Sequence, residues 1–116
     1  MLAAHEKVFE DPVGFRILDS RFHARLSAIA ANIVLERIAY GLYNMGLDLR
    51  RRATQSPALI RRSLGEHTMI VRAIAAADSE AAARAMGLHL EHIEASTRAV
   101  IEEDTRALSR RVARKA

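Results

Sequence analysis

The chain has 116 residues, of which 50% are apolar and only 4% aromatic, and its formal net charge is +4 at pH 7. This length fits one domain, so we expect residues 1–116 to form a single domain. The chain contains no cysteine, which excludes disulfides and thiolate metal sites and leaves His and carboxylate side chains as metal ligands. No stretch resembles a signal peptide or approaches the roughly 18 apolar residues of a membrane span, so we expect a cytoplasmic protein that does not bind membranes.

The first two predicted helices cover residues 12–30 and residues 33–52. Asp11-Pro12 combines an N-cap with proline at the first helical position, which is typical of a helix start. Asn32 is a cap for the second helix, which ends in the basic cluster at residues 50–52, where cations suit the helix dipole. The apolar residues recur at helical spacing: Phe15, Leu18, Phe22, Leu26 and Ile29 in the first helix, and Leu35, Ile38, Leu42, Met45 and Leu49 in the second.

The third and fourth predicted helices cover residues 57–76 and residues 79 to beyond 105. Ser56-Pro57 repeats the signal for a helix start, and Asp78 caps the fourth helix. The basic residues within the last eleven positions are interpreted as a solvated helix end, with contact to nucleic acid as the alternative. Residues 1–10 are expected to hold the end of a further helix. Since the loops are short, the sequence predicts an all-α, antiparallel helical bundle.

Four polar residues fall on the apolar faces of these helices. Asp19 lies about 40° from Phe15 around the first helix, and His23 follows it by one turn. His67 lies within the apolar stripe of the third helix, and His89 lies within that of the fourth. Three helices therefore direct polar groups into the predicted core.

A divalent metal ion is the simplest partner for these four residues. A buried carboxylate costs several kcal/mol unless a cation or hydrogen-bond donors compensate it. Three imidazoles and one carboxylate suit zinc first, with nickel, manganese and iron as alternatives. The competing interpretation is a hydrogen-bonded core, with Asp19 paired to an arginine and no metal. His92, at the edge of the stripe, is a weaker candidate for the same site.

Candidate effector-binding residues lie near the end of the second predicted helix. Tyr43 and Asn44 are expected either to pack at the edge of the core or to line a ligand cavity. The arginines at 50–52 are expected to form a solvated helix end, with the alternative that one of them, Arg52 in particular, binds an anionic ligand.

The spacing of these residues resembles the FCD domain, the effector-binding domain of FadR-type GntR transcription regulators. The resemblance covers about residues 11–95, and 43 residues separate His23 from His67 while 21 separate His67 from His89. The motif positions are Asp19-Ser-Arg-Phe22-His23, Asn32, Glu66-His67, Ala73-Ile74, Asp78, Ala82, Met86 and His89-Leu90.

This resemblance implies a metal, a ligand and a regulatory role. It implies that Asp19, His23, His67 and His89 bind the metal beside a cavity for a small carboxylate effector. Effector binding would alter how paired winged helix-turn-helix domains bind operator DNA. No such segment occurs in these 116 residues, and the opening helices of the bundle also look truncated, so the chain is either a fragment or a shortened regulator. We expect a homodimer, because a shortened bundle exposes an apolar face.

Two other classes of function compete with a sensing domain. A metal with open positions can activate water in an enzyme, but the inward-facing set contains no further general base. The sequence also lacks HExxH and the ExxH pair of di-iron bundles. The other alternative is a stand-alone helical module, either metal-binding or purely structural. We therefore expect a protein that is not an enzyme.

Overall fold

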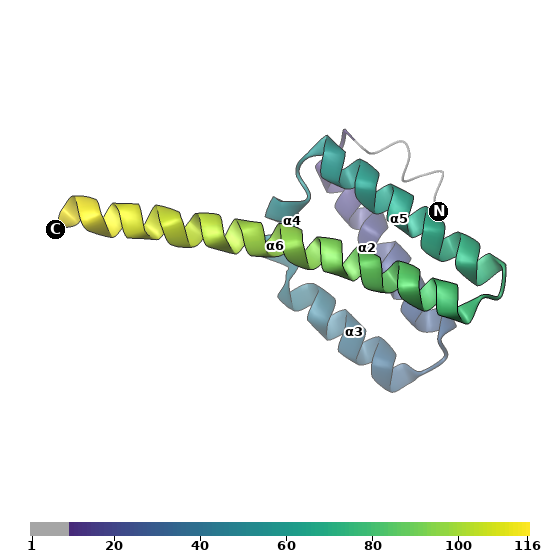
Figure 1. The fold of residues 1–116 in the computed structure, drawn as a ribbon. Helices are drawn as coiled ribbons and strands as arrows, with labels where there is room; N and C mark the ends of the chain where they lie inside the picture. The colour runs from purple at the N-terminus through teal and green to yellow at the C-terminus, as the bar shows by residue number, and fades with distance from the viewer. Residues whose placement is uncertain (1–9) are drawn as a thin grey trace.

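The computed structural model describes residues 10–116, which form five helices and contain no strand. The all-α prediction is confirmed within this range. The helix end predicted for residues 1–10 falls on residues 1–9, outside the described range. The helices, labelled as in Figure 1, are α2 (Pro12–Ile29), α3 (Ile33–Met45), α4 (Leu47–Ala53), α5 (Pro57–Ala75) and α6 (Ser79–Lys115).

Side-chain caps fix three of the helix starts. The Asp11 carboxylate accepts a hydrogen bond from the Gly14 amide at 3.0 Å, and Asp78 accepts one from the Ala81 amide at 2.9 Å. Asn32 Oδ1 accepts from the first-turn amides of α3. Each cap satisfies backbone donors that have no partner within the helix. Helix α5 begins at Pro57 as predicted, although Ser56 makes no side-chain hydrogen bond there.

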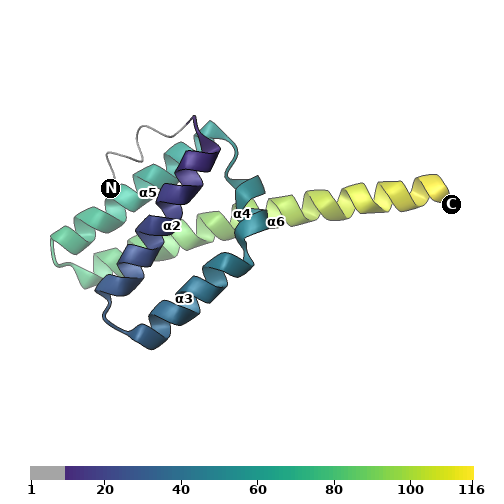
Figure 2. The same cartoon turned by 180° about the vertical axis from the view of Figure 1, so that it is seen from behind.

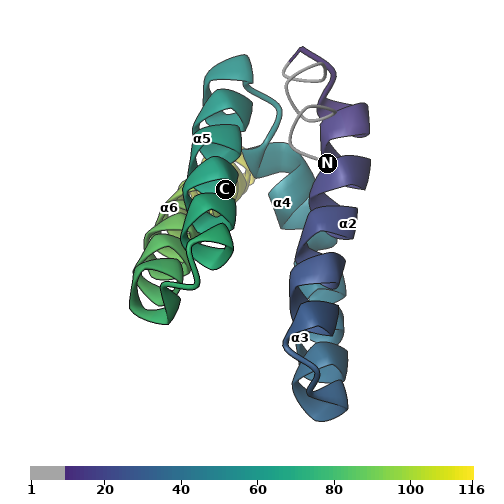
Figure 3. The same ribbon diagram turned by 90° about the vertical axis from the view of Figure 1, so that its right-hand side faces the viewer.

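The helices form two layers (Figures 1 and 3). Helix α5 and the N-terminal half of α6 lie side by side in one layer and contact each other, while α2 and α3 form the other. The short helix α4 connects the layers and contacts α6. Seen from behind in Figure 2, the C-terminal half of α6 extends well beyond the other helices. Successive long helices run antiparallel, as the short loops predict.

The second predicted helix differs from the structure in one respect. The chain breaks at Gly46, which caps α3 and precedes α4, so residues 33–52 form two helices rather than one. Helical spacing of apolar residues continues across the break and therefore does not reveal it. The break lets α3 pack on α2 while α4 contacts α6.

The core is small and lies between α2, α5 and α6. Its fully buried apolar side chains include Phe15, Ile60 and Ile70. Helix α3 contributes no buried residue, and its apolar stripe is open to solvent, with Ile38 52% and Met45 85% exposed. No helix of residues 10–116 covers this face. None of the helices in that range is long and apolar enough to span a membrane.

Candidate metal and effector site

Three helices bring the predicted metal ligands together between the two layers. Asp19 and His23 lie one turn apart on α2, His67 comes from α5, and His89 comes from α6. Asp19, His67 and His89 are buried, with exposed fractions of 7%, 0% and 1%. Phe22 stacks on the His67 ring, with centroids 4.1 Å apart and an interplanar angle of 20°. This packing fixes the plane of the most deeply buried imidazole.

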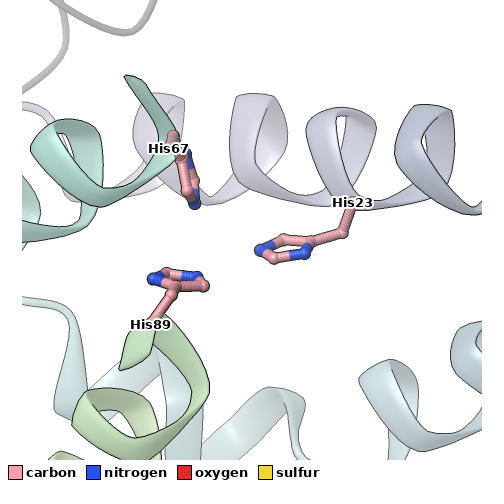
Figure 4. Close-up of side chains that lie close together, drawn as sticks. All are labelled: His23, His67 and His89. Atoms are coloured by element: carbon pink, nitrogen blue, oxygen red, sulfur yellow. The ribbon is translucent and has the colours of Figure 1, made fainter. Parts of the chain in front are cut away.

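The three imidazoles face a common point (Figure 4). One nitrogen of each of His23, His67 and His89 lies within 4.8 Å of the others. Asp19 Oδ1 lies 3.4 Å from Nε2 of His23 and also 3.4 Å from Nε2 of His67. The carboxylate oxygen thus stands beside two of the three converging nitrogens.

The kinds of ligand atom and the two Asp19 contacts suit a divalent ion. Zinc binds imidazole nitrogen and carboxylate oxygen at about 2.0 to 2.2 Å, which places neighbouring ligand atoms of a tetrahedron about 3.3 Å apart. The two Asp19 contacts of 3.4 Å match this spacing, whereas the imidazole nitrogens lie up to 4.8 Å apart and would have to move closer together to bind one ion. A set of three nitrogens and one oxygen, without sulfur, is one that zinc and other first-row metals accept. The residues present therefore fit a metal ion.

Burial and hydrogen bonding set the charges at the site. Burial alone would raise the pKa of Asp19, but the hydrogen bond and charge of His23, the charge of His67 and the Tyr43 hydroxyl lower it to about 2. Burial and the neighbouring Asp19 carboxylate raise the pKa of Tyr43. Burial also lowers the pKa of His89 below its ordinary value of 6.5, although the hydrogen bond and the charge of Glu66 act to raise it. An ionised Asp19 and a neutral His89 are the forms that bind metals.

A second buried carboxylate, Glu66, adjoins the site. Its Oε2 lies 2.6 Å from Nδ1 of His89, and its Oε1 hydrogen-bonds Nδ1 of His92. The residue pattern alone did not indicate that Glu66 is a buried residue of the site, because Arg62 and Glu66, four residues apart, look like an exposed ion pair. His92, the weaker candidate, is directed to Glu66 rather than to the other imidazoles.

A cavity of about 650 Å³ adjoins the imidazoles and extends between α2, α3 and α6. Tyr43 lines it, and the Tyr43 hydroxyl donates a 2.8 Å hydrogen bond to Asp19 Oδ2. Arg50 also lines the cavity, with its guanidinium 3.9 Å from the centre of the Tyr43 ring. The other two predicted effector residues lie elsewhere. Asn44 is not among the lining residues, and Arg52 pairs with Asp104 on the far part of α6.

Comparison with known proteins identifies the family. The sequence profile of the FCD domain matches residues 1–92. Searches of curated proteins and of solved structures returned no significant match. The profile covers most of the chain, including all four converging residues. The chain therefore belongs to the FCD domain family, the effector-sensing domains of GntR-type transcription regulators.

Proposed function

We propose that this domain binds one divalent metal ion through Asp19, His23, His67 and His89, with zinc favoured over nickel, manganese or iron. The observation that carries the proposal is Asp19 Oδ1, which lies 3.4 Å from Nε2 of two different histidines. When bound, the ion would offer a Lewis-acidic centre to an oxygen of the effector. The four side chains would hold it between α2, α5 and α6.

The proposed effector is a small carboxylate that occupies the adjoining cavity. Tyr43 connects the two parts of the site, since its hydroxyl binds Asp19 and its ring carries the Arg50 guanidinium. Arg50 is a suitable partner for a carboxylate because guanidinium groups pair with it in a bidentate manner. We therefore assign the anion contact to Arg50 in place of Arg52, whose guanidinium is already paired with Asp104. Asn44 stays a prediction.

The proposed role of the effector is to control transcription. In a homodimeric cytoplasmic regulator, effector binding at this domain would change how winged helix-turn-helix domains bind operator DNA. The FCD family consists of regulators rather than enzymes, and the proposal assigns no catalytic step.

Metal analysis of the purified protein tests the first part. We expect close to one zinc or similar ion per chain, and we expect Asp19→Ala to lose it while circular dichroism shows unchanged helix content. Metal binding to the folded state alone also stabilises it, so a chelator should lower the melting temperature of the wild type. A wild-type protein that takes up no metal, and that does not melt higher with added zinc or nickel, contradicts the proposal.

Thermal shift with a panel of mono-, di- and tricarboxylates tests the second part. We expect at least one of these acids to raise the melting temperature of the metal-loaded protein. Arg50→Ala should abolish that rise, whereas Arg52→Ala, on the same short helix, should keep it. Loss of the response in Arg52→Ala alone would instead support the original sequence prediction.

A further inference from the structure

Glu66 forms a buried cluster with His89 and His92 of α6. The Glu66 side chain, 8% exposed, projects from α5 towards α6. Its two oxygens bind Nδ1 of His89, at 2.6 Å, and Nδ1 of His92, three residues further along α6. Arg62 lies one turn before Glu66, with Nε 3.8 Å from Oε1.

The chemistry of the two contacts determines where the ring protons are. A carboxylate accepts hydrogen bonds and does not donate them, so Nδ1 of both His89 and His92 must carry a proton. A neutral imidazole with its proton on Nδ1 has its lone pair on Nε2. For His89, which is grouped with His23 and His67, this leaves Nε2 as the nitrogen that can bind a metal.

We propose that Glu66 is a positioning residue for the metal site, and that His92 acts on the site only through Glu66. Glu66 fixes the protonation and orientation of the His89 ring, while His92 and Arg62 hold the Glu66 carboxylate in place. The inference rests on the proposed metal binding by His89. In this arrangement His92, which is not placed to bind the metal itself, has the role of holding Glu66.

Burial supports a specific role for this carboxylate. A carboxylate between two packed helices costs several kcal/mol unless its oxygens are satisfied, and an apolar side chain would fill the space without that cost. Both oxygens of Glu66 are satisfied by imidazoles from α6, one of which belongs to the metal site. Carboxylates that orient a metal-bound imidazole in this way raise metal affinity about 10- to 100-fold.

Metal affinity, measured by competition with a coloured chelator, tests the inference. We expect Glu66→Ala to weaken binding about 10- to 100-fold. Glu66→Gln keeps the size of the side chain and one acceptor oxygen, so it should recover part of the loss. Glu94→Ala, which removes an exposed carboxylate on α6, is the matched control and should bind as the wild type does.

A double-mutant cycle separates positioning from general stability. His92→Ala should weaken metal binding in the wild type but have no further effect in the Glu66→Ala background. In addition, nitrogen NMR of the metal-free protein should show the His89 proton on Nδ1, and Glu66→Ala should move part of it to Nε2.

The possible failures are distinct. A wild-type protein that binds no metal overturns this inference together with the proposed function. A wild type that binds metal, with unchanged affinity in both Glu66 variants, overturns the positioning role alone. Equal effects of His92→Ala in the two backgrounds, or a His89 proton already on Nε2 in the wild type, also overturn it.

Discussion

Asp19 uses its two carboxylate oxygens for different partners. Oδ1 lies beside the imidazoles of His23 and His67, whereas Oδ2 accepts the Tyr43 hydroxyl. The Tyr43 contact fixes the rotation of the carboxylate, so that Oδ1 faces the imidazoles. A single side chain thereby connects the candidate metal site with the cavity.

The low pKa of Asp19 predicts a pH-dependent stability. Its pKa falls from an ordinary 3.8 to about 2 on folding, so between these values the unfolded chain binds more protons than the folded one. The stabilisation is therefore complete above pH 3.8 and is lost as the pH falls through about 2. The shift corresponds to about 2 kcal/mol.

Asp19→Asn removes this titration and serves as the reference. For metal-free protein, we expect the wild type to lose about 2 kcal/mol of unfolding free energy relative to Asp19→Asn between pH 5 and pH 2. Urea unfolding at each pH measures the difference. A difference that stays constant with pH would show that Asp19 is not stabilised in its ionised form.

The inward position of the polar core residues was easier to predict from the sequence than their surroundings. Asp19, His67 and His89 are recognisable because a polar residue within an apolar stripe conflicts with helical periodicity, and all three are buried. Glu66 gives no such conflict, since it lies beside the stripe and one turn from Arg62. Its role depends on contacts with α6, 23 and 26 residues away in sequence.

At the scale of whole helices, the division between α3 and α4 is what the sequence did not predict. The break at Gly46 reorients the following turn, so that Arg50 lines the cavity while Arg52 reaches Asp104 on α6. Apolar spacing and good helix formers continue on both sides of the glycine. Only packing of α4 against α6 reveals which arginine faces the cavity, and such packing is a tertiary effect that local propensity does not contain.

Helix α3 should depend strongly on its N-cap. It buries no side chain, so burial contributes little to holding it in place, and local terms carry more weight. Asn32 Oδ1 accepts hydrogen bonds from the amides of Val34 and Leu35, at 3.2 and 3.1 Å. These contacts satisfy two of the first backbone donors of the helix.

We expect Asn32→Ala to lower the free energy of unfolding by about 1 kcal/mol, and Asn32→Asp to stay close to the wild type because aspartate caps equally well. Chemical denaturation measures both values. Equal losses in the two variants would mean that Asn32 acts through something other than its side-chain cap.

For the molecule as a whole, the uncovered side of α3 is the feature that bears on assembly. Leu35, Ile38 and Met45 are 58%, 52% and 85% exposed, and none of them lines the cavity. An apolar face of this kind usually marks a surface that another molecule covers. In a symmetric dimer of this chain, each subunit would cover the apolar face of α3 on the other subunit.

Charge substitution tests whether this side of α3 is the dimer interface. In a symmetric dimer, the same patch meets itself, so Ile38→Glu would place two carboxylates in one interface and should convert a dimer into a monomer. Leu108→Glu is the control, because Leu108 is a similarly exposed apolar residue, 63% exposed, on the projecting end of α6. Sedimentation velocity at micromolar concentration distinguishes the two states. If Leu108→Glu dissociates the dimer while Ile38→Glu does not, the interface lies on α6; a wild type that sediments as a monomer would remove the dimer from the proposed function.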